Sequence, residues 1–140
     1  MNLNRRLIVG CALCAVPGLI ATGTSASAQS AAPAATAGVK RKILSQLDGP
    51  TPGYVTIAVE LEIEPGALVA RHTHPGIEST YFISGSGELL VDGQPAKPFK
   101  AGEAIQVPPG TVHSVKNGPT TTKGIGTYIV EKGKPLASPA

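Results

Sequence analysis

Cysteine and tryptophan are nearly absent from this sequence. Its 140 residues contain two cysteines, no tryptophan, three tyrosines and two phenylalanines. Both cysteines, Cys11 and Cys14, lie in an apolar run near the N-terminus. If that run is removed, the remaining chain has no thiolate to bind a metal, to form a disulfide or to act as a nucleophile. The five aromatic residues show no stacking pattern, which argues against a nucleic-acid-binding surface.

Charged residues are also scarce, at 15% of the chain, with twelve basic and nine acidic side chains. Two of the basic residues, Arg5 and Arg6, precede the apolar run. Without them, ten basic residues face nine acidic ones, a formal charge of +1. Such a balance gives no reason to expect nucleic acid or an anionic membrane as a partner.

The long apolar run covers residues 7–20. It follows Arg5 and Arg6 and leads to the small residues Ala26, Ser27 and Ala28, which is the pattern of a secretory signal peptide with an Ala-x-Ala cleavage site. We therefore expect residues 1–28 to be removed and the protein to be periplasmic or secreted. The run is short for a membrane span, so a retained anchor is the less favoured alternative. The arginine pair partly resembles a twin-arginine signal, and the choice between this export route and the general one stays open.

Removing 28 of the 140 residues leaves 112, enough for one domain but too few for two. Residues 29–39 are mostly Ala, Ser, Thr and Pro, which bury too little apolar surface to order themselves, and we interpret them as a flexible leader. The folded domain is expected at 40–134, followed by a loose tail at 135–140. For the basic cluster at 40–42, a solvated flank of a first short element is preferred to a partner-binding patch.

Hydrophobic periodicity predicts strands in this domain. From Tyr54 to Ile63 polar and apolar residues alternate, as in a strand with one buried face. Asp92-Gly93 is typical of a two-residue hairpin turn, and no segment of the expected mature chain has helical periodicity over a useful length. Further strands are predicted at 67–72, 78–84, 88–91, 104–107, 111–115 and 124–130. Seven short strands with many glycines and prolines between them predict an all-β sandwich or small barrel.

The three histidines of the chain lie in two segments punctuated by glycine and proline. His72 and His74 project from one face of a predicted strand, because residues i and i+2 share a face. Glu78 lies beyond a Pro-Gly turn, and His113 comes from a distant strand. Imidazole and carboxylate are ligands of borderline divalent transition metals, so these four residues predict a site for one such ion. The same ligands accept Fe, Mn, Ni, Cu, Co or Zn, and on a six-coordinate ion they would leave two positions open.

A His-x-His pair on a strand also arises from two surface histidines, so the residues around it matter. The first segment resembles the first motif of the cupin superfamily position by position, through Gly66, His72, His74, Glu78 and Gly85. The second segment resembles the second motif, through Gly102, Pro108, Gly110, His113 and Asn117. The chain is therefore similar to the small single-domain bacterial cupins.

This resemblance implies an all-β fold, a single-domain double-stranded β-helix or jelly-roll barrel. It implies that His72, His74, Glu78 and His113 hold the metal near one end of the lumen, and that the protein is a homodimer. Asn117 is expected to form side-chain hydrogen bonds at the end of a strand.

Alternation along the strands predicts which residues line the pocket. If His72 points inward, so do Leu68 and Ala70, whereas Arg71 points away. By the same rule Thr80 and Phe82 accompany Glu78, and Thr111 and Val115 accompany His113. A mostly apolar lining suits dioxygen and a small, flat or hydrophobic substrate better than a sugar phosphate. Tyr81 is expected to serve core or dimer packing, and Tyr128 to lie on the last strand.

Three hypotheses for function remain open. The first is a metal-dependent oxygenase resembling the quercetinase-like cupins, which acts on a small enolic or phenolic substrate with Glu78 as the base. The second is an isomerase or lyase in which the metal polarises a carbonyl without redox change. The third is a non-catalytic module that binds a small ligand or the metal itself.

Overall fold

Ten strands and no helix make up residues 36–140, the part of the chain that the computed structural model describes. Within this part no helix could therefore span a membrane. The predicted signal peptide and most of the predicted leader lie outside it. The strands are β1 (Val39–Asp48), β2 (Tyr54–Ile63), β3 (Leu68–Thr73), β4 (Gly76–Ser84), β5 (Ser86–Val91), β6 (Lys97–Lys100), β7 (Ala104–Val107), β8 (His113–Asn117), β9 (Thr122–Glu131) and β10 (Ser138–Pro139).

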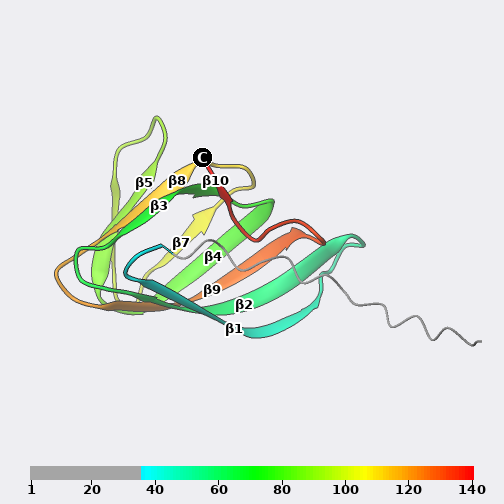
Figure 1. The fold of residues 1–140 in the computed structure, drawn as a ribbon, viewed down its shortest axis with the longest axis horizontal. Coiled ribbons are helices and arrows are strands. Elements are labelled where there is room, and N and C mark those ends of the chain that lie inside the picture. Colours follow the sequence, from blue (N-terminus) through cyan, green and yellow to red (C-terminus); the bar gives the residue numbers. More distant parts are fainter. Residues whose placement is uncertain (1–35) are drawn as a thin grey trace, which may run out of the picture.

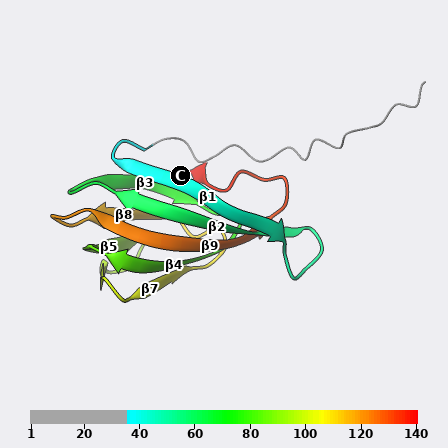
Figure 2. The same ribbon diagram turned by 90° about the horizontal axis from the view of Figure 1, so that it is seen from below.

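The strands form two five-stranded antiparallel sheets. One has the order β1-β2-β9-β4-β7 and the other the order β10-β3-β8-β5-β6, so neighbouring strands are often far apart in the sequence. Figure 1 shows the two sheets as separate layers, and Figure 2 shows the first sheet with its strands side by side. This arrangement is the predicted all-β double-stranded β-helix.

The apolar face of β2 supplies much of the core, as its alternation predicted. Val55, Ile57, Val59, Leu61 and Ile63 are all buried. A second part of the core lies between the two sheets, where the rings of Phe82 and Phe99 stack with centroids 3.8 Å apart. The space between the sheets is thus packed with side chains except where the cavity described below opens.

Three strands differ from the sequence prediction. The first short element is a ten-residue edge strand, β1, which pairs along its length with β2. Strands β6 and β10 were not predicted. The amide of Gln94 donates to the carbonyl of Val91, so Asp92 and Gly93 do form a turn. However, the β5–β6 ladder ends at the Leu89–Lys97 pair, and the connection is longer than the predicted two-residue hairpin.

The C-terminal residues 135–140 are not the loose tail that was predicted. Leu136 is buried among the core residues Tyr128 and Val130, and Ser138 and Pro139 pair with Thr73 and His72 on β3. One apolar residue in a polar and small-residue tail is a weak sequence signal, yet its burial and the pairing with β3 together hold the tail on the barrel.

A bulge in β3 overturns part of the predicted pocket lining. Val69 pairs with Val115 and His72 with His113, so β3 has one more residue between these pairs than β8. As a result Val69 is buried, whereas Leu68 and Ala70, which were predicted to face inward, are exposed. Thr111, which was also predicted to line the pocket, is only half-buried and does not line the cavity described below. The remaining predictions hold, because Thr80, Phe82 and Val115 are buried and Arg71 is exposed.

Candidate metal centre

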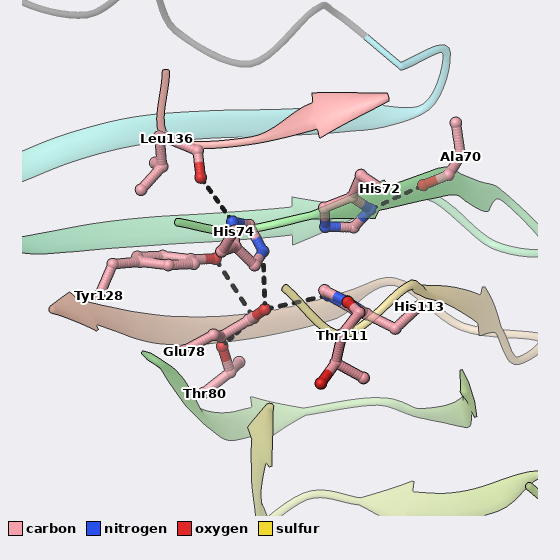
Figure 3. A network of polar contacts seen from close by, with 9 residues as sticks. All are labelled: Ala70, His72, His74, Glu78, Thr80, Thr111, His113, Tyr128 and Leu136. Carbon is pink, nitrogen blue, oxygen red and sulfur yellow. Dashed lines mark hydrogen bonds and ion pairs between the residues drawn. The ribbon is translucent and has the colours of Figure 1, made fainter. Parts of the chain in front are cut away.

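The structure brings the four predicted ligands together between the two sheets (Figure 3). His72 lies near the end of β3, His74 directly follows that strand, Glu78 is on β4, and His113 begins β8. Each residue offers one ligand atom, and all four atoms lie within 4.8 Å of one another. His74, Glu78 and His113 are 4%, 6% and 2% exposed, whereas His72 is half-buried and closest to solvent.

Strand register explains this convergence. His72 and His113 are direct partners on the β3–β8 ladder, and their ring centroids are 4.2 Å apart. The short connection from His74 to Glu78 requires glycine at position 76. A Cβ atom there would lie 2.0 Å from the carbonyl oxygen of Ile129 on β9, so any side chain would push β4 away from its neighbour.

The imidazoles are oriented by the backbone. Each Nδ1 lies within hydrogen-bond distance of a carbonyl oxygen: 2.7 Å from Ala70 for His72, 2.6 Å from Leu136 for His74, and 2.9 Å from Thr111 for His113. Because a carbonyl only accepts, each Nδ1 carries the proton, and the Nε2 of the neutral ring has a free lone pair. Histidines that bind metals are oriented by this kind of contact.

Glu78 completes the set with its two oxygens in different roles. Oε1 accepts hydrogen bonds from the hydroxyls of Thr80, at 2.7 Å, and Tyr128, at 3.2 Å. Oε2 lies 3.0 Å from Nε2 of His74 and 3.2 Å from Nε2 of His113. Figure 3 shows these contacts meeting at the carboxylate. When both rings are neutral, Oε2 and the two nitrogens direct lone pairs at the same small volume.

The donor set therefore fits a cation. Nε2 of His74 is buried and makes no aligned hydrogen bond, in spite of its 3.0 Å distance from Glu78. A buried polar atom without a partner costs about 1–3 kcal/mol, which a bound metal would recover. Bonds of about 2.0–2.2 Å put ligand atoms roughly 3–4.4 Å apart, so small side-chain shifts suffice to close the observed set.

The protonation states also suit a metal. Burial opposes ionisation of Glu78, but the close contacts of its carboxylate with His113 and His74 outweigh burial and lower the pKa. Burial lowers the pKa of His72 to about 4. For His113 burial acts in the same direction, but the contact with Glu78 outweighs it and raises the pKa. At neutral pH an ionised Glu78 and a neutral His72 are ready to coordinate, whereas at His113 the raised pKa lets a proton compete with the metal.

A mostly apolar cavity of about 530 Å³, including its open mouth, adjoins the ligands. Its apolar lining comes from both sheets and from the C-terminal segment, and includes Leu61, Ile63, Val69, Phe82, Ile105, Val115 and Leu136. The predicted apolar pocket is therefore present, although Leu68 and Ala70 do not contribute to it.

Two polar residues of this cavity were not predicted as part of the site. Tyr128 was assigned only to the last strand, but it is buried opposite Glu78 on the β4–β9 ladder and hydrogen-bonded to it. The sequence did contain a signal for this position, because Tyr128 and the apolar Val130 are two residues apart and therefore share a face of the predicted strand. Arg41 was interpreted as part of a solvated flank, but it lines the cavity. Tyr81 is 51% exposed, so of the two roles predicted for it core packing is wrong and dimer packing stays a prediction.

Comparison with known structures supports the fold. The chain is similar to an uncharacterized conserved protein with a double-stranded β-helix domain from Klebsiella pneumoniae, at 22% identity over 73% of this chain and 84% of that one, with a TM-score of 0.57. It is similar to a cupin-like protein from Thermotoga maritima, at 28% identity over 64% and 67% of the two chains, with a TM-score of 0.56.

A third similar structure is the polyketide cyclase RemF from Streptomyces resistomycificus, at 24% identity over 70% of this chain and 69% of that one, with a TM-score of 0.57. No curated protein matches the chain. The model of the cupin domain family matches residues 59–134, which is more than half of the chain and contains all four clustered ligands. The two motifs, the double-stranded β-helix and this match agree, and the protein belongs to the cupin family.

Proposed function

We propose that this protein is an exported metal-binding cupin that acts as a metal-dependent oxygenase on a small enolic or phenolic substrate. The observation that carries the proposal is the meeting of three imidazole nitrogens and a carboxylate oxygen beside a mostly apolar cavity. His72, His74, Glu78 and His113 would hold the ion. Such an ion supplies Lewis acidity and, if redox-active, a route for electrons between substrate and dioxygen.

The base in this proposal is Glu78, the one carboxylate among the residues that line the cavity. Hydrogen bonds lower its pKa, so it is ionised at neutral pH but is a weak base. It can therefore take a proton only from an acidic group, such as the hydroxyl of an enol or a phenol. Tyr128 and Thr80 donate to its Oε1 and keep the carboxylate in position.

Oxygen consumption tests the proposal directly. Protein loaded separately with iron, manganese, nickel, copper or cobalt is incubated with a panel of catechols, flavonols and β-diketones, and dissolved oxygen is followed with an electrode. At least one metal and substrate pair is expected to consume oxygen, and Glu78→Gln is expected to lower that rate by about 10²–10⁴-fold, as loss of a general base does. Fully metallated protein that consumes no oxygen across the panel would contradict the oxygenase.

Two alternatives remain under the same geometry. In a metal-dependent isomerase or lyase the ion would polarise a carbonyl without redox change. A polyketide cyclase shares the fold, so the barrel is compatible with chemistry of another class. Zinc in protein isolated from its native compartment, with turnover under nitrogen, would favour this alternative. In a non-catalytic module, saturable binding of a small ligand would occur with no turnover at all.

Export and assembly belong to the proposal as well. Cleavage after Ala28 predicts a mature protein that begins at Gln29 in the periplasm or the medium, which N-terminal sequencing of the fractionated protein checks. A homodimer is proposed because Ile77, Tyr81 and Ile83 are exposed on one face of β4, where a second copy can cover them. A monomeric mass in light scattering at micromolar concentration would contradict the dimer.

A further inference from the structure

Arg41 is the one basic side chain in the lining of the cavity beside the metal ligands, apart from the histidines. It lies on β1 directly opposite Leu61 of β2, and the side chains of directly opposed residues project from the same face of a sheet. Leu61 is buried in the core, so Arg41 also faces the lumen. A neighbouring hollow is lined by Arg41 as well, together with His72 and the C-terminal residues Ala137 and Ser138.

Arg41 is the only lysine or arginine of residues 36–140 that is not exposed. Its guanidinium has no hydrogen-bond or ion-pair partner among these residues, whereas its exposed neighbour Lys40 is bonded to Glu62 at 3.0 Å and Arg71 to Asp92. Burial lowers the pKa of Arg41, while Tyr128 and Glu78 act in the opposite direction, so the guanidinium is within electrostatic reach of the site. A half-buried cation without a counter-ion is costly unless a ligand supplies the missing charge.

The charge of the loaded site points to the same ligand. A divalent ion with the carboxylate of Glu78 and neutral imidazoles carries +1, and Arg41 adds a second positive charge in an apolar cavity. An acid with two ionised oxygens would balance both charges. The planar guanidinium matches a carboxylate through two parallel N–H···O bonds.

We propose that Arg41 binds a carboxylate of the substrate, and that the natural substrate is a small apolar carboxylic acid that also bears the enolic or phenolic hydroxyl. The carboxylate in this proposal follows from the placement of Arg41, and the hydroxyl rests on the proposed function. A sugar phosphate is a poorer match, because the rest of the lining is mostly apolar and offers few partners for its hydroxyl groups.

Binding of matched probes tests this assignment without any turnover. Zinc-loaded protein labelled with ¹⁵N is titrated with benzoate and benzamide, and with butanoate and butanamide, and dissociation constants are taken from the chemical shifts. Each acid is expected to bind about tenfold or more tightly than its amide, as charge-assisted hydrogen bonds are stronger than neutral ones. Arg41→Gln should bring the two constants to within about twofold of each other.

Two further variants make the result specific. Arg41→Lys keeps the positive charge but loses the two parallel N–H donors of the guanidinium, so part of the preference for the acid over the amide should remain. Arg71→Gln removes an exposed arginine that is already paired with Asp92, and it should keep the full preference. The spectrum of each variant reports whether it is folded.

An unchanged acid preference in folded Arg41→Gln would mean that the ion alone binds the carboxylate, and this would overturn the assignment. Equal binding of acid and amide by the unmodified protein would overturn it too. Acid binding through Arg41 in a protein that consumes no oxygen would contradict the oxygenase and leave the carboxylate site intact. The two failures are therefore distinguishable.

Discussion

The two ends of β8 hold buried polar clusters of opposite character. At its end, Nδ2 of Asn117 lies 3.0 Å, 2.8 Å and 3.0 Å from the carbonyl oxygens of Ile63, Glu64 and Thr120, and its Oδ1 accepts a 2.6 Å hydrogen bond from Thr122. At its start, His113 belongs to the cluster in which Nε2 of His74 has no hydrogen bond. The first cluster is satisfied by the chain itself, and the second is not.

This difference separates a structural from a candidate functional role within one sequence motif, because His113 and Asn117 both belong to the second motif. A buried network with all its partners strengthens the fold, whereas an unpaired buried group destabilises it until a ligand arrives. Asn117 is accordingly a structural residue that joins β8 to the chain following β2 and to β9. His113 belongs to the candidate metal site, where a bound ion would supply the partner that Nε2 of His74 lacks.

The largest expected effect is the stabilisation of the protein by a metal bound at the start of β8, where His113 lies. Chelator-treated protein should melt roughly 10 °C or more below metal-loaded protein, because saturation at about one hundred times the dissociation constant adds ~2.7 kcal/mol, and each kcal/mol shifts a domain of this size by roughly 4–8 °C. His113→Ala should hold less than about one tenth of the metal of the unmodified protein. Calorimetry and elemental analysis measure both quantities. Equal melting temperatures with and without metal would mean that the cluster is not a metal site.

The Asn117 end should respond in the opposite way. Asn117→Ala removes the amide donor that three carbonyl oxygens share and the acceptor of the Thr122 hydroxyl, so the free energy of unfolding should fall by about 2–4 kcal/mol. Metal content per folded molecule should stay unchanged. Urea unfolding and elemental analysis check the two statements. A loss of metal from folded Asn117→Ala would show that the two ends are not independent.

Removal of residues 135–140 should lower metal affinity at the start of β8 and leave the hydrogen bonds of Asn117 at its other end intact. The truncation deletes the carbonyl of Leu136 that orients His74, and loss of an outer contact of this kind typically lowers metal affinity about 10–100-fold. Competition with a chromogenic chelator measures the affinity. Leu136→Ala is the matched control, because it keeps the carbonyl while removing the buried side chain. If both variants lose the same affinity, packing by the side chain matters and the hydrogen bond does not.

The smallest expected effect concerns acid stability of the metal-free protein. Folded His72 has a pKa of about 4 against an ordinary value of 6.5, so between these pH values the unfolded chain binds more protons. The free energy of unfolding should therefore fall as the pH is lowered through this window. His72→Gln should flatten that slope in urea unfolding at several pH values with chelator present.

His113 provides the control for this prediction. Its pKa is raised in the folded state, so its contribution is present at low pH and is lost as the pH rises. This loss occurs above the ordinary value of 6.5, so His113→Gln should leave the slope between pH 4 and 6.5 nearly unchanged and should reduce the loss of stability above pH 6.5. The same change of slope in both variants would contradict the assignment of the two pKa shifts.

Much of the molecule could be predicted from local pattern. Alternation along β2 predicted its buried face, and the two motifs predicted which histidines and which glutamate meet. Both signals are local, because parity and spacing act over a few residues. The all-β class followed from glycine and proline placed between short apolar segments.

The remainder depends on register between distant strands. Arg41 faces the lumen because it is opposite Leu61, a pairing that nothing in residues 40–42 encodes. The bulge that exposes Leu68 and Ala70 is one extra residue in β3 relative to β8. The burial of Leu136 depends on its packing against Tyr128 and Val130 of β9. None of these can be inferred from one segment alone.

The position of the chain end has a practical consequence. The amide of Ala140 donates to the carbonyl of Arg71, one residue before His72, so residues attached after Ala140 emerge beside the rim of the metal centre. A histidine-rich affinity tag fused there would offer competing imidazoles within a short reach of the ion. Metal analyses and ligand titrations on this barrel are best carried out with the tag on the other terminus or cut away.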